Sequence, residues 1–325
     1  MGQIMLLMLV VAALMVEGSF AGHTFIVESG CDPAFLARDA HYTLCLVDIG
    51  TDAPLSAADK QAIVDTHNTY RANVSPTATN MVKLVWDDEL AVYAGKWARQ
   101  CYISHDSYSA RSVPSMPGVS IGQNIAAGYK SVMKGVDGWH SEVDFFEHGV
   151  GPTEPGKVVG HYTQVVGYRA IRIGCGEAIC PNKYGRYQVC NYAMGQMSSD
   201  IKTPFEKGAS CSKCPVGKCS DNLCDCGGKL CLNGGSLDTS TCSCTCMGTW
   251  TGDTCSKDCK GMTCLNGGTL DGNTCSCTCP DTWEGDTCSK KKCKVDVSRC
   301  DSVPLAHCDL SPIVRLYCPR KCGLC

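Results

Sequence analysis

Signatures of several enzyme classes are missing from this 325-residue sequence. No glycine-rich phosphate loop precedes the distinctive stretch around His161, which argues against a nucleotide-dependent enzyme. No Ser or Cys nucleophile motif stands near His161, and the chain has no His-Glu-x-x-His, so the usual peptidase signatures are absent. The formal net charge of -3 is nearly balanced. The chain as a whole is therefore not expected to bind nucleic acid or another polyanion.

Apolar runs long enough to cross a membrane are also missing. Residues 4–16 form an apolar run of signal-peptide length, too short for a membrane helix and without a flanking Lys or Arg. Cleavage after Gly18 or Ala21 would suit the small-residue rule, so residues 1–21 are interpreted as a signal peptide. No later run could span a bilayer, and the end at Cys325 lacks the apolar tail of a lipid anchor. We therefore expect a secreted, soluble protein.

Cysteine, by contrast, is abundant. There are 28 cysteines, six in residues 1–210 and 22 in residues 211–325. The number is even, so no free thiol is required. The first part can bury an ordinary core, whereas the second part needs disulfides and hence an oxidising compartment. Zinc-binding cysteines in a cytosolic protein are the alternative, which the leader disfavours.

Local patterns in residues 56–192 predict a mixed α+β domain. Ser56 and Asp59 form a capping box that opens one helix, and an Asp at 87 or 88 caps a second. Apolar spacing predicts a third helix over residues 131–148, and strand-like runs cover 121–125, 170–175 and 187–192. Helices on both sides of a small antiparallel sheet give an α-β-α sandwich.

Four motifs stand in the order and spacing of one known family. They are His67-Asn68-x-x-Arg71, Gly122-Gln123-Asn124-Ile125, Gly160-His161-Tyr162-Thr163-Gln164 and Cys190-Asn191-Tyr192. Residues 57–200 thereby resemble the CAP superfamily, which includes cysteine-rich secretory proteins, insect venom antigens and plant pathogenesis-related proteins. The sequence departs from the family where it usually has Trp, Pro and Gly-Asn; these places hold Gly167, Met194, Gln196 and Met197.

The resemblance implies a groove lined by His67, Gln123, Glu142 and His161. The two imidazoles, His67 and His161, could hold zinc, with Glu142 fixing a tautomer or activating a water. Gln123 stands where the family often has an acid, and an amide cannot act as a base. The alternative is that the two histidines only tie helices together. A hydrolase would use His67, Glu142 and His161 as catalytic residues, and a sterol or lipid site would need an apolar groove.

The cysteines of the first part and its flanks can be paired in outline. Cys31 and Cys45 lie in an N-terminal extension, residues 22–56, and are expected to pair with each other. The family implies Cys175–Cys190, which leaves Cys101 for Cys180. Residues 201–225, with Cys211, Cys214, Cys219 and Cys224, resemble a family hinge whose pairing stays open. Asn73 is a candidate glycosylation site, although Pro76 follows its sequon.

Residues 226–255 and 259–288 are a repeat with identical cysteine spacing, offset by 33 residues. Asn-Gly-Gly and Trp-x-Gly patterns resemble EGF-like modules. The acidic cluster of calcium-binding modules is missing at 220–223 and 256–258, so no calcium site is expected. Family connectivity implies Cys226–Cys242, Cys231–Cys244, Cys246–Cys255, Cys259–Cys275, Cys264–Cys277 and Cys279–Cys288.

The last six cysteines, in residues 293–325, resemble a ShK-toxin module. Family pairing implies Cys293–Cys325, Cys300–Cys318 and Cys308–Cys322. Residues 290–325 carry eight basic and three acidic side chains, which suits contact with an acidic extracellular protein, glycan or membrane surface. A solvated lysine linker is the alternative. Pro312 and Ile313 occupy the places of the toxin Lys-Tyr pair, which argues against pore plugging.

Together these patterns predict a secreted mosaic protein. The first hypothesis is a non-enzymatic binding or modulating protein, of venom, matrix or defence secretions, whose C-terminal modules choose the partner. The alternatives are a metal-dependent hydrolase, a sterol or lipid binder, and an ion-channel modulator acting through the C-terminal module.

Overall fold

The computed structural model describes residues 19–20, 23–292, 300–302, 304–306, 308, 314, 318 and 321–322. The predicted signal peptide, the Cys293–Cys325 pair and the Pro312–Ile313 position lie wholly or mostly outside these residues. The chain divides into two compact units, Met1–Leu230 with Leu237–Ser243, and Cys231–Ser236 with Cys244–Cys325. Among the described residues, no helix combines the length and apolar character that a membrane crossing requires.

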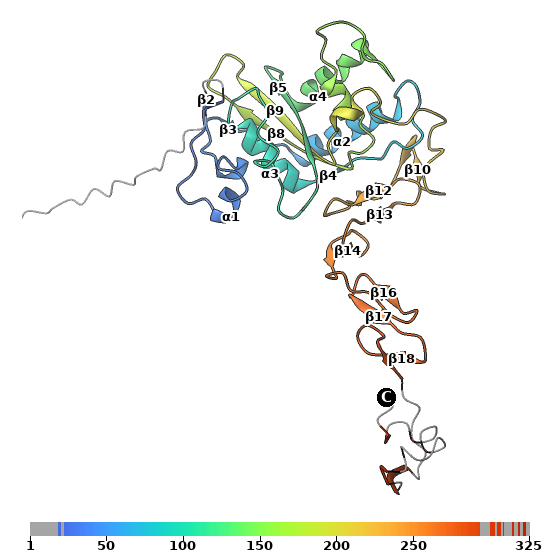
Figure 1. Cartoon of the computed structure of the whole chain (residues 1–325). Helices are drawn as coiled ribbons and strands as arrows, with labels where there is room; N and C mark the ends of the chain where they lie inside the picture. Colours follow the sequence, from blue (N-terminus) through green and yellow to red (C-terminus); the bar gives the residue numbers. More distant parts are fainter. Residues whose placement is uncertain are drawn as a thin grey trace, which may run out of the picture. The chain divides into compact units, whose positions relative to one another are not determined.

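A five-stranded sheet forms the centre of the first unit (Figure 1). Its main order is β3 (Thr51–Asp52), β8 (Arg172–Ile179), β9 (Arg186–Ala193) and β5 (Ile121–Ala127), with antiparallel neighbours. The fifth strand, β4 (Val85–Trp86), pairs in parallel with β8. The expectation of a small antiparallel sheet is therefore right except for β4, which precedes a helix and runs beside β8.

Three helices cover the sheet, as the α-β-α prediction required. They are α2 (Ala57–Ala72), α3 (Asp88–Ala98) and α4 (Val132–His140). The capping box of Ser56 and Asp59 opens α2, and Asp87 caps α3. The expected helix over 131–148 ends early. The chain passes into a 3₁₀ helix, η2 (Ser141–Phe145), and a hairpin of β6 (Phe146–Glu147) and β7 (Gly151–Pro152).

The apolar spacing beyond His140 predicted a helix that does not form there. Its apolar residues reach the core from a 3₁₀ helix and a β-strand instead. Val143, in η2, and Phe146, in β6, are half-buried against the same cluster that α4 fills. Burial of an apolar side chain therefore did not require the helix to continue. Periodicity records which residues are covered and does not by itself fix the backbone that carries them.

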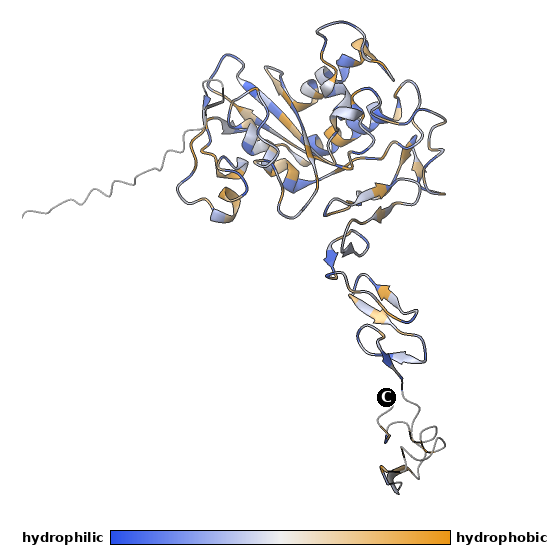
Figure 2. Cartoon of the chain, viewed as in Figure 1, coloured by the Kyte–Doolittle hydropathy of each residue, from blue (hydrophilic) through white to orange (hydrophobic). Residues whose placement is uncertain are grey.

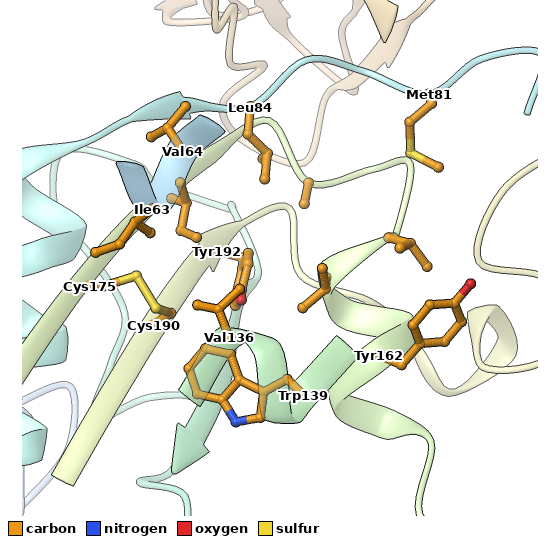
Figure 3. Packing of buried hydrophobic residues seen from close by; sticks show 14 of the residues in the cluster. Ile63, Val64, Met81, Leu84, Val136, Trp139, Tyr162, Cys175, Cys190 and Tyr192 are labelled. Carbon is orange, nitrogen blue, oxygen red and sulfur yellow. A yellow bond between two sulfur atoms is a disulfide. The ribbon is translucent and has the colours of Figure 1, made fainter. Parts of the chain in front are cut away.

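The two faces of the sheet pack two separate cores. On one face, α2, α4 and the sheet residues Ile173, Cys175, Cys190 and Tyr192 form the larger core (Figure 3). The opposite face packs α3 against a second set of sheet residues, Ile125, Ala178, Tyr187 and Val189. Alternate residues of a strand point to opposite faces. Figure 2 shows hydrophilic residues interrupting the hydrophobic ones along the sheet strands.

The N-terminal extension is part of this second core. Phe25 and Leu46 are buried against α3, and β3 adds an edge strand to the sheet. Lys96 of α3 forms ion pairs with Glu28 at 2.8 Å and Asp48 at 3.1 Å. The segment also holds β2 (His23–Thr24), which pairs with β1 (Ser19–Phe20) just before it, the short helix α1 (Pro33–Leu36) and the 3₁₀ helix η1 (Thr43–Cys45).

Disulfides join all the described cysteines for which a partner is also described. In the first unit the pairs are Cys31–Cys45, Cys101–Cys180, Cys175–Cys190, Cys211–Cys219, Cys214–Cys224 and Cys226–Cys242. In the second unit they are Cys231–Cys244, Cys246–Cys255, Cys259–Cys275, Cys264–Cys277, Cys279–Cys288, Cys300–Cys318 and Cys308–Cys322. The two hinge pairs fill in the connectivity that the sequence had left open.

Short strands make up most of the remaining regular structure. The first unit adds η3 (Ser198–Asp200), β10 (Cys219–Ser220) and β11 (Leu223–Cys224). The rest are β12 (Ser236–Asp238), β13 (Ser243–Thr245), β14 (Trp250–Thr251), β15 (Lys257–Asp258), β16 (Thr269–Asp271), β17 (Ser276–Thr278), β18 (Trp283–Glu284), β19 (Lys290–Lys291) and η4 (Cys300–Ser302).

Candidate functional site

The distinctive mid-chain motif folds as a short helix, α5 (Gly160–Val165), whose start is held from outside by Glu142. No side chain of α5 caps its own N-terminus. Glu142 Oε2 instead accepts the backbone N–H groups of His161 at 2.9 Å and Tyr162 at 3.0 Å. The other oxygen, Oε1, accepts from His161 Nδ1 at 2.6 Å. One carboxylate thus caps the helix and orients the imidazole.

His161 is further fixed by the sheet and by α4. The Trp139 ring stacks beside the imidazole, with centroids 6.4 Å apart, and Asn124 Nδ2 donates to the His161 carbonyl at 3.0 Å. Gln196, one of the departures from the family pattern, donates to the Gly160 carbonyl at 2.8 Å. These contacts hold the first turn of α5 while the side chain of His161 remains about one-third exposed.

The structure places His67 away from this exposed site, and its contacts give no support to the prediction that it holds a metal with His161. Its side chain is fully buried in α2. Nδ1 lies 2.8 Å from the Ile63 carbonyl, which can only accept, so Nδ1 carries the proton. Nε2 must then accept from the Tyr192 hydroxyl at 2.9 Å. Burial lowers the pKa of His67 to about 4, and its only lone pair is occupied.

His105, which the sequence analysis did not single out, is an exposed imidazole. It lies in the loop after α3 and is hydrogen-bonded through Nδ1 to Gln123 Oε1 at 2.8 Å. Gln123 in turn donates to Asn191 Oδ1 at 3.2 Å. Loss of hydration lowers the pKa of His105, and the charges of Arg111 and His161 act in the same direction. Gln123, which bonds His105, and Asn124, which bonds the His161 carbonyl, are neighbours in β5.

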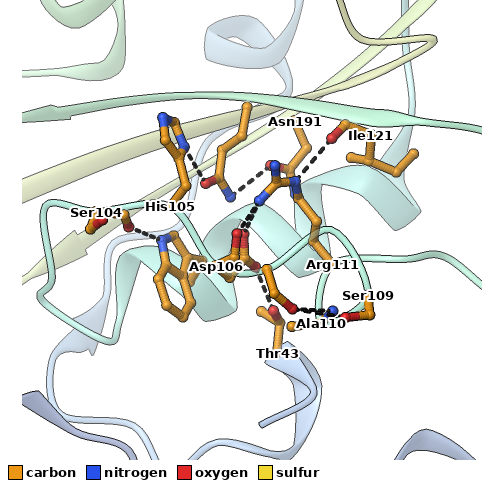
Figure 4. A network of polar contacts seen from close by, with 12 residues as sticks. Thr43, Ser104, His105, Asp106, Ser109, Ala110, Arg111, Ile121 and Asn191 are labelled. Atoms are coloured by element: carbon orange, nitrogen blue, oxygen red, sulfur yellow. Dashed lines mark hydrogen bonds and ion pairs between the residues drawn. The ribbon is translucent and has the colours of Figure 1, made fainter. Parts of the chain in front are cut away.

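A buried polar network supports the His105 loop from beneath (Figure 4). Arg111 forms an ion pair with Asp106 at 2.7 Å and donates through Nε to the Ile121 carbonyl at 2.9 Å. Thr43 Oγ1 donates to the other oxygen of Asp106 at 2.5 Å. Burial raises the pKa of Asp106, with Arg111 opposing the shift. The network joins the N-terminal extension, the loop and the edge of β5.

His105 and His161 are both hydrogen-bonded through the same ring nitrogen, Nδ1. The oxygens of Gln123 and Glu142 accept from Nδ1 of His105 and His161, respectively, so each neutral ring keeps its lone pair on Nε2. Two imidazoles supply two of the four ligands that zinc takes in proteins. No third His, Cys, Asp or Glu joins them in a metal-holding group within the described part of the chain. The donor set therefore does not fit a resident catalytic zinc.

Local sequence features distinguish the buried His67 from the exposed His105. His67 follows Ile63 by four residues, so both lie on the inner face of α2. A histidine on an apolar stripe is expected to be a core residue. His105 follows Cys101 by four residues, and the Cys101–Cys180 disulfide fixes the start of its loop next to the sheet. This disulfide is the sequence feature that indicates His105 as a candidate site residue.

Comparison with known proteins adds independent findings. The cysteine-rich secretory protein family, CAP, matches residues 64–192. The cysteine-rich venom protein Mr30 of Conus marmoreus is 38% identical over 233 residues, covering 70% of this chain and 76% of that protein. Cysteine-rich secretory protein 3 of Equus caballus is 38% identical over 207 residues, covering 62% and 76%. A crystal structure of NaASP2 with Zn²⁺ is 26% identical, covers 52% of this chain and 96% of its own, and has a TM-score of 0.42.

Proposed function

The chain belongs to the cysteine-rich secretory protein family and is secreted, and we propose that it acts as a binding protein rather than a hydrolase. The observation that carries this proposal is the state of Glu142. Glu142 is engaged with α5, because its two oxygens receive two backbone N–H groups and the His161 ring. A general base must be able to reach a substrate water and take its proton.

Two other residues, Gln123 and Asp106, support the same proposal. Gln123 stands where a second acid would be needed, and its amide cannot accept a proton from water at neutral pH. Asp106 is buried and paired with Arg111. A hydrolytic mechanism would therefore have to disconnect Glu142 from α5 before it could begin.

The test is a peptidase screen on the full-length protein with and without added zinc. A mixture of fluorogenic peptides is incubated with the wild type and with His161→Ala. We expect no turnover above background in either. Turnover that disappears in His161→Ala but persists in His148→Gln, a histidine hydrogen-bonded elsewhere to the Phe205 carbonyl, would refute the proposal.

A second function is favoured by the hydrogen bonds of the two rings. Because Nδ1 of each is bonded, His105 and His161 would hold an exchangeable divalent cation through Nε2. The Glu142–His161 contact has the form of the carboxylate–histidine pairs that orient metal-ligating imidazoles. Such a cation would supply a positive charge to which a partner's carboxylate or water could bind. Calorimetric titration of zinc should give one weak site that is lost in His105→Ala and in His161→Ala and kept in His148→Gln. Equal zinc binding by the wild type and the three variants would show that His105 and His161 do not hold the cation.

The C-terminal part remains our candidate for choosing the partner. We propose that the repeats 226–255 and 259–288 are EGF-like modules, that residues 293–325 form a ShK-like module, and that the basic side chains from Lys290 onward contact an acidic extracellular surface. The described pairs of both repeats have the first-to-third, second-to-fourth, fifth-to-sixth order that supports the first assignment. Retention on heparin that falls when Lys290, Lys291 and Lys292 are changed to Ser would support the contact, and unchanged retention would contradict it.

A further inference from the structure

A small cavity of about 110 Å³ lies between the N-terminal extension and the loop that follows α3. Its surface is mainly apolar, and its walls include the rings of Phe25, Trp97 and Tyr102, the imidazole of His41, and the polar pair Asp39 and Ser107. A cavity of roughly 150 Å³ can hold one benzene molecule. The present cavity is therefore large enough for a group of about five heavy atoms.

Three aromatic rings line the cavity and pack against one another. Phe25 lies 5.3 Å from Trp97 and 5.7 Å from Tyr102, measured between ring centroids. Trp97 and Tyr102 meet edge to face at 6.4 Å. Phe25 and Trp97 are buried, so the wall is preformed. The faces of such rings carry negative potential and attract cations that are weakly hydrated.

The cavity also has an acidic wall residue, Asp39, and the charge of His41 in the same wall acts on it. Asp39 Oδ2 accepts the hydroxyls of Ser107 at 2.5 Å and Ser109 at 2.6 Å, and Oδ1 accepts the backbone N–H of His41 at 2.8 Å. Partial burial by itself would raise the pKa of Asp39, but these hydrogen bonds lower it. No Lys or Arg of the described residues forms an ion pair with Asp39, whereas the nearby Asp106 is neutralised by Arg111.

We propose that this cavity binds a small organic ammonium ion. The ammonium methyl groups lie against the rings of Phe25, Trp97 and Tyr102, and the carboxylate of Asp39 balances the charge. The aromatic wall favours a diffuse organic cation over a strongly hydrated metal ion. The cavity borders the His105–His161 pair, because His105 is also one of its wall residues. Ammonium binding uses the rings and Asp39 and requires no metal at that pair.

The test compares choline with 3,3-dimethylbutan-1-ol, in which a carbon replaces the nitrogen, by calorimetry on the full-length protein in the presence of EDTA. The two probes have the same shape and differ in charge. We expect choline to bind about tenfold more tightly, since cation–π contacts in partly desolvated sites have roughly that strength. Failure to bind choline, or equal affinity for both probes, would overturn the proposal with no variant needed.

Two variants locate the site. Asp39→Asn should bring the two affinities within about twofold of each other, and Tyr102→Leu should weaken choline binding by about fivefold. Asp32→Asn removes an exposed carboxylate of the same segment, the N-cap of α1, and should leave the tenfold preference unchanged. A preference that survives in both Asp39→Asn and Tyr102→Leu would place the ammonium site elsewhere and contradict this assignment.

Discussion

The two units of the chain reach a folded state by different physical means. The first unit buries large side chains on both faces of a sheet, including Tyr192, Leu90 and Ile63. In the second unit, the buried apolar residues among those described are all cysteines: Cys231, Cys255, Cys259, Cys288, Cys300, Cys308 and Cys318. The first unit can therefore place unusual polar groups in a core, whereas the second depends on covalent links and turn geometry.

The backbone shows the same contrast. Within each repeat, an asparagine adopts a left-handed conformation, Asn233 with φ 53° and Asn266 with φ 52°. Each donates from its side chain to the carbonyl of the last cysteine of its repeat, at 2.8 Å to Cys255 and 2.9 Å to Cys288. Identical sequence positions thus make identical local contacts in both repeats. Each repeat is therefore stabilised by specific local contacts, and it lacks a large apolar core that could compensate for the loss of one of them.

The largest expected effect is a complete loss of structure in one repeat, tested by removing one disulfide in each unit. Cys264–Cys277 and Cys175–Cys190 close loops of similar length, with separations of 13 and 15 residues, so loop entropy predicts a loss of about 3 kcal/mol for each. We expect Cys264→Ala with Cys277→Ala to abolish the structure of residues 259–288. Cys175→Ala with Cys190→Ala should leave the first unit folded but less stable. Hydrogen exchange of peptides 259–288 and 170–193 measures both, and native protection of 259–288 in its variant would contradict the contrast.

Arg71 provides the next largest effect and tests the first unit alone. Its guanidinium is fully buried and donates to the carbonyls of Val82, Val165, Gly167 and Ala170 at 2.7–3.2 Å, without a carboxylate partner. Burial lowers the pKa of Arg71 to about 9. Arg71→Met leaves these carbonyls unpaired and should cost about 3–5 kcal/mol.

Guanidinium unfolding followed by tryptophan fluorescence measures the loss at Arg71. Arg38→Met, an exposed arginine of the N-terminal extension, should change stability by less than about 0.5 kcal/mol. A loss below about 1 kcal/mol for Arg71→Met would mean that water replaces the guanidinium, and the first unit would then tolerate polar defects better than its burial indicates.

The buried His67 should make the stability of the first unit depend on pH, and the second unit should not share this dependence. The pKa of His67 is about 4 in the folded chain and 6.5 in the unfolded one, so between these values the unfolded state binds more protons. Stability from this group is complete above pH 6.5, falls as the pH is lowered, and levels off below about pH 4 after a loss of about 3 kcal/mol. His67→Gln should flatten the wild-type curve by that amount.

Denaturation midpoints measured from pH 7.5 to pH 4 test the His67 prediction, with His148→Gln as the control that should keep the wild-type slope. The difference between the His67→Gln and wild-type curves removes the contributions of the other histidines. Parallel curves would show that Tyr192 and Ile63 do not hold the imidazole neutral.

Part of this architecture could be predicted because it rests on local rules. The capping box at Ser56 and the cap at Asp87 need only neighbouring residues. The site was harder, since His105 reaches it through a loop whose path depends on contacts remote in sequence: the Arg111–Asp106 pair and the Thr43 hydroxyl. His67 lies in a family motif and His105 does not. A motif, however, does not show whether a side chain faces solvent or the core.

The smallest expected loss of stability comes from Glu142, the partly buried carboxylate that caps α5 and orients His161. Glu142→Gln keeps one oxygen for α5 or for His161 but not for both, because its amide nitrogen cannot accept. We expect a loss of about 1–2 kcal/mol, the usual cost of a helix cap with a charged acceptor. The exposed Glu147→Gln should be neutral. Nitrogen NMR of the His161 ring should show a single Nδ1–H tautomer in the wild type and a mixture in Glu142→Gln. A single unchanged tautomer would mean that Trp139 and Asn124 orient the imidazole without the carboxylate, which would leave Glu142 available as a base and revive the hydrolase alternative.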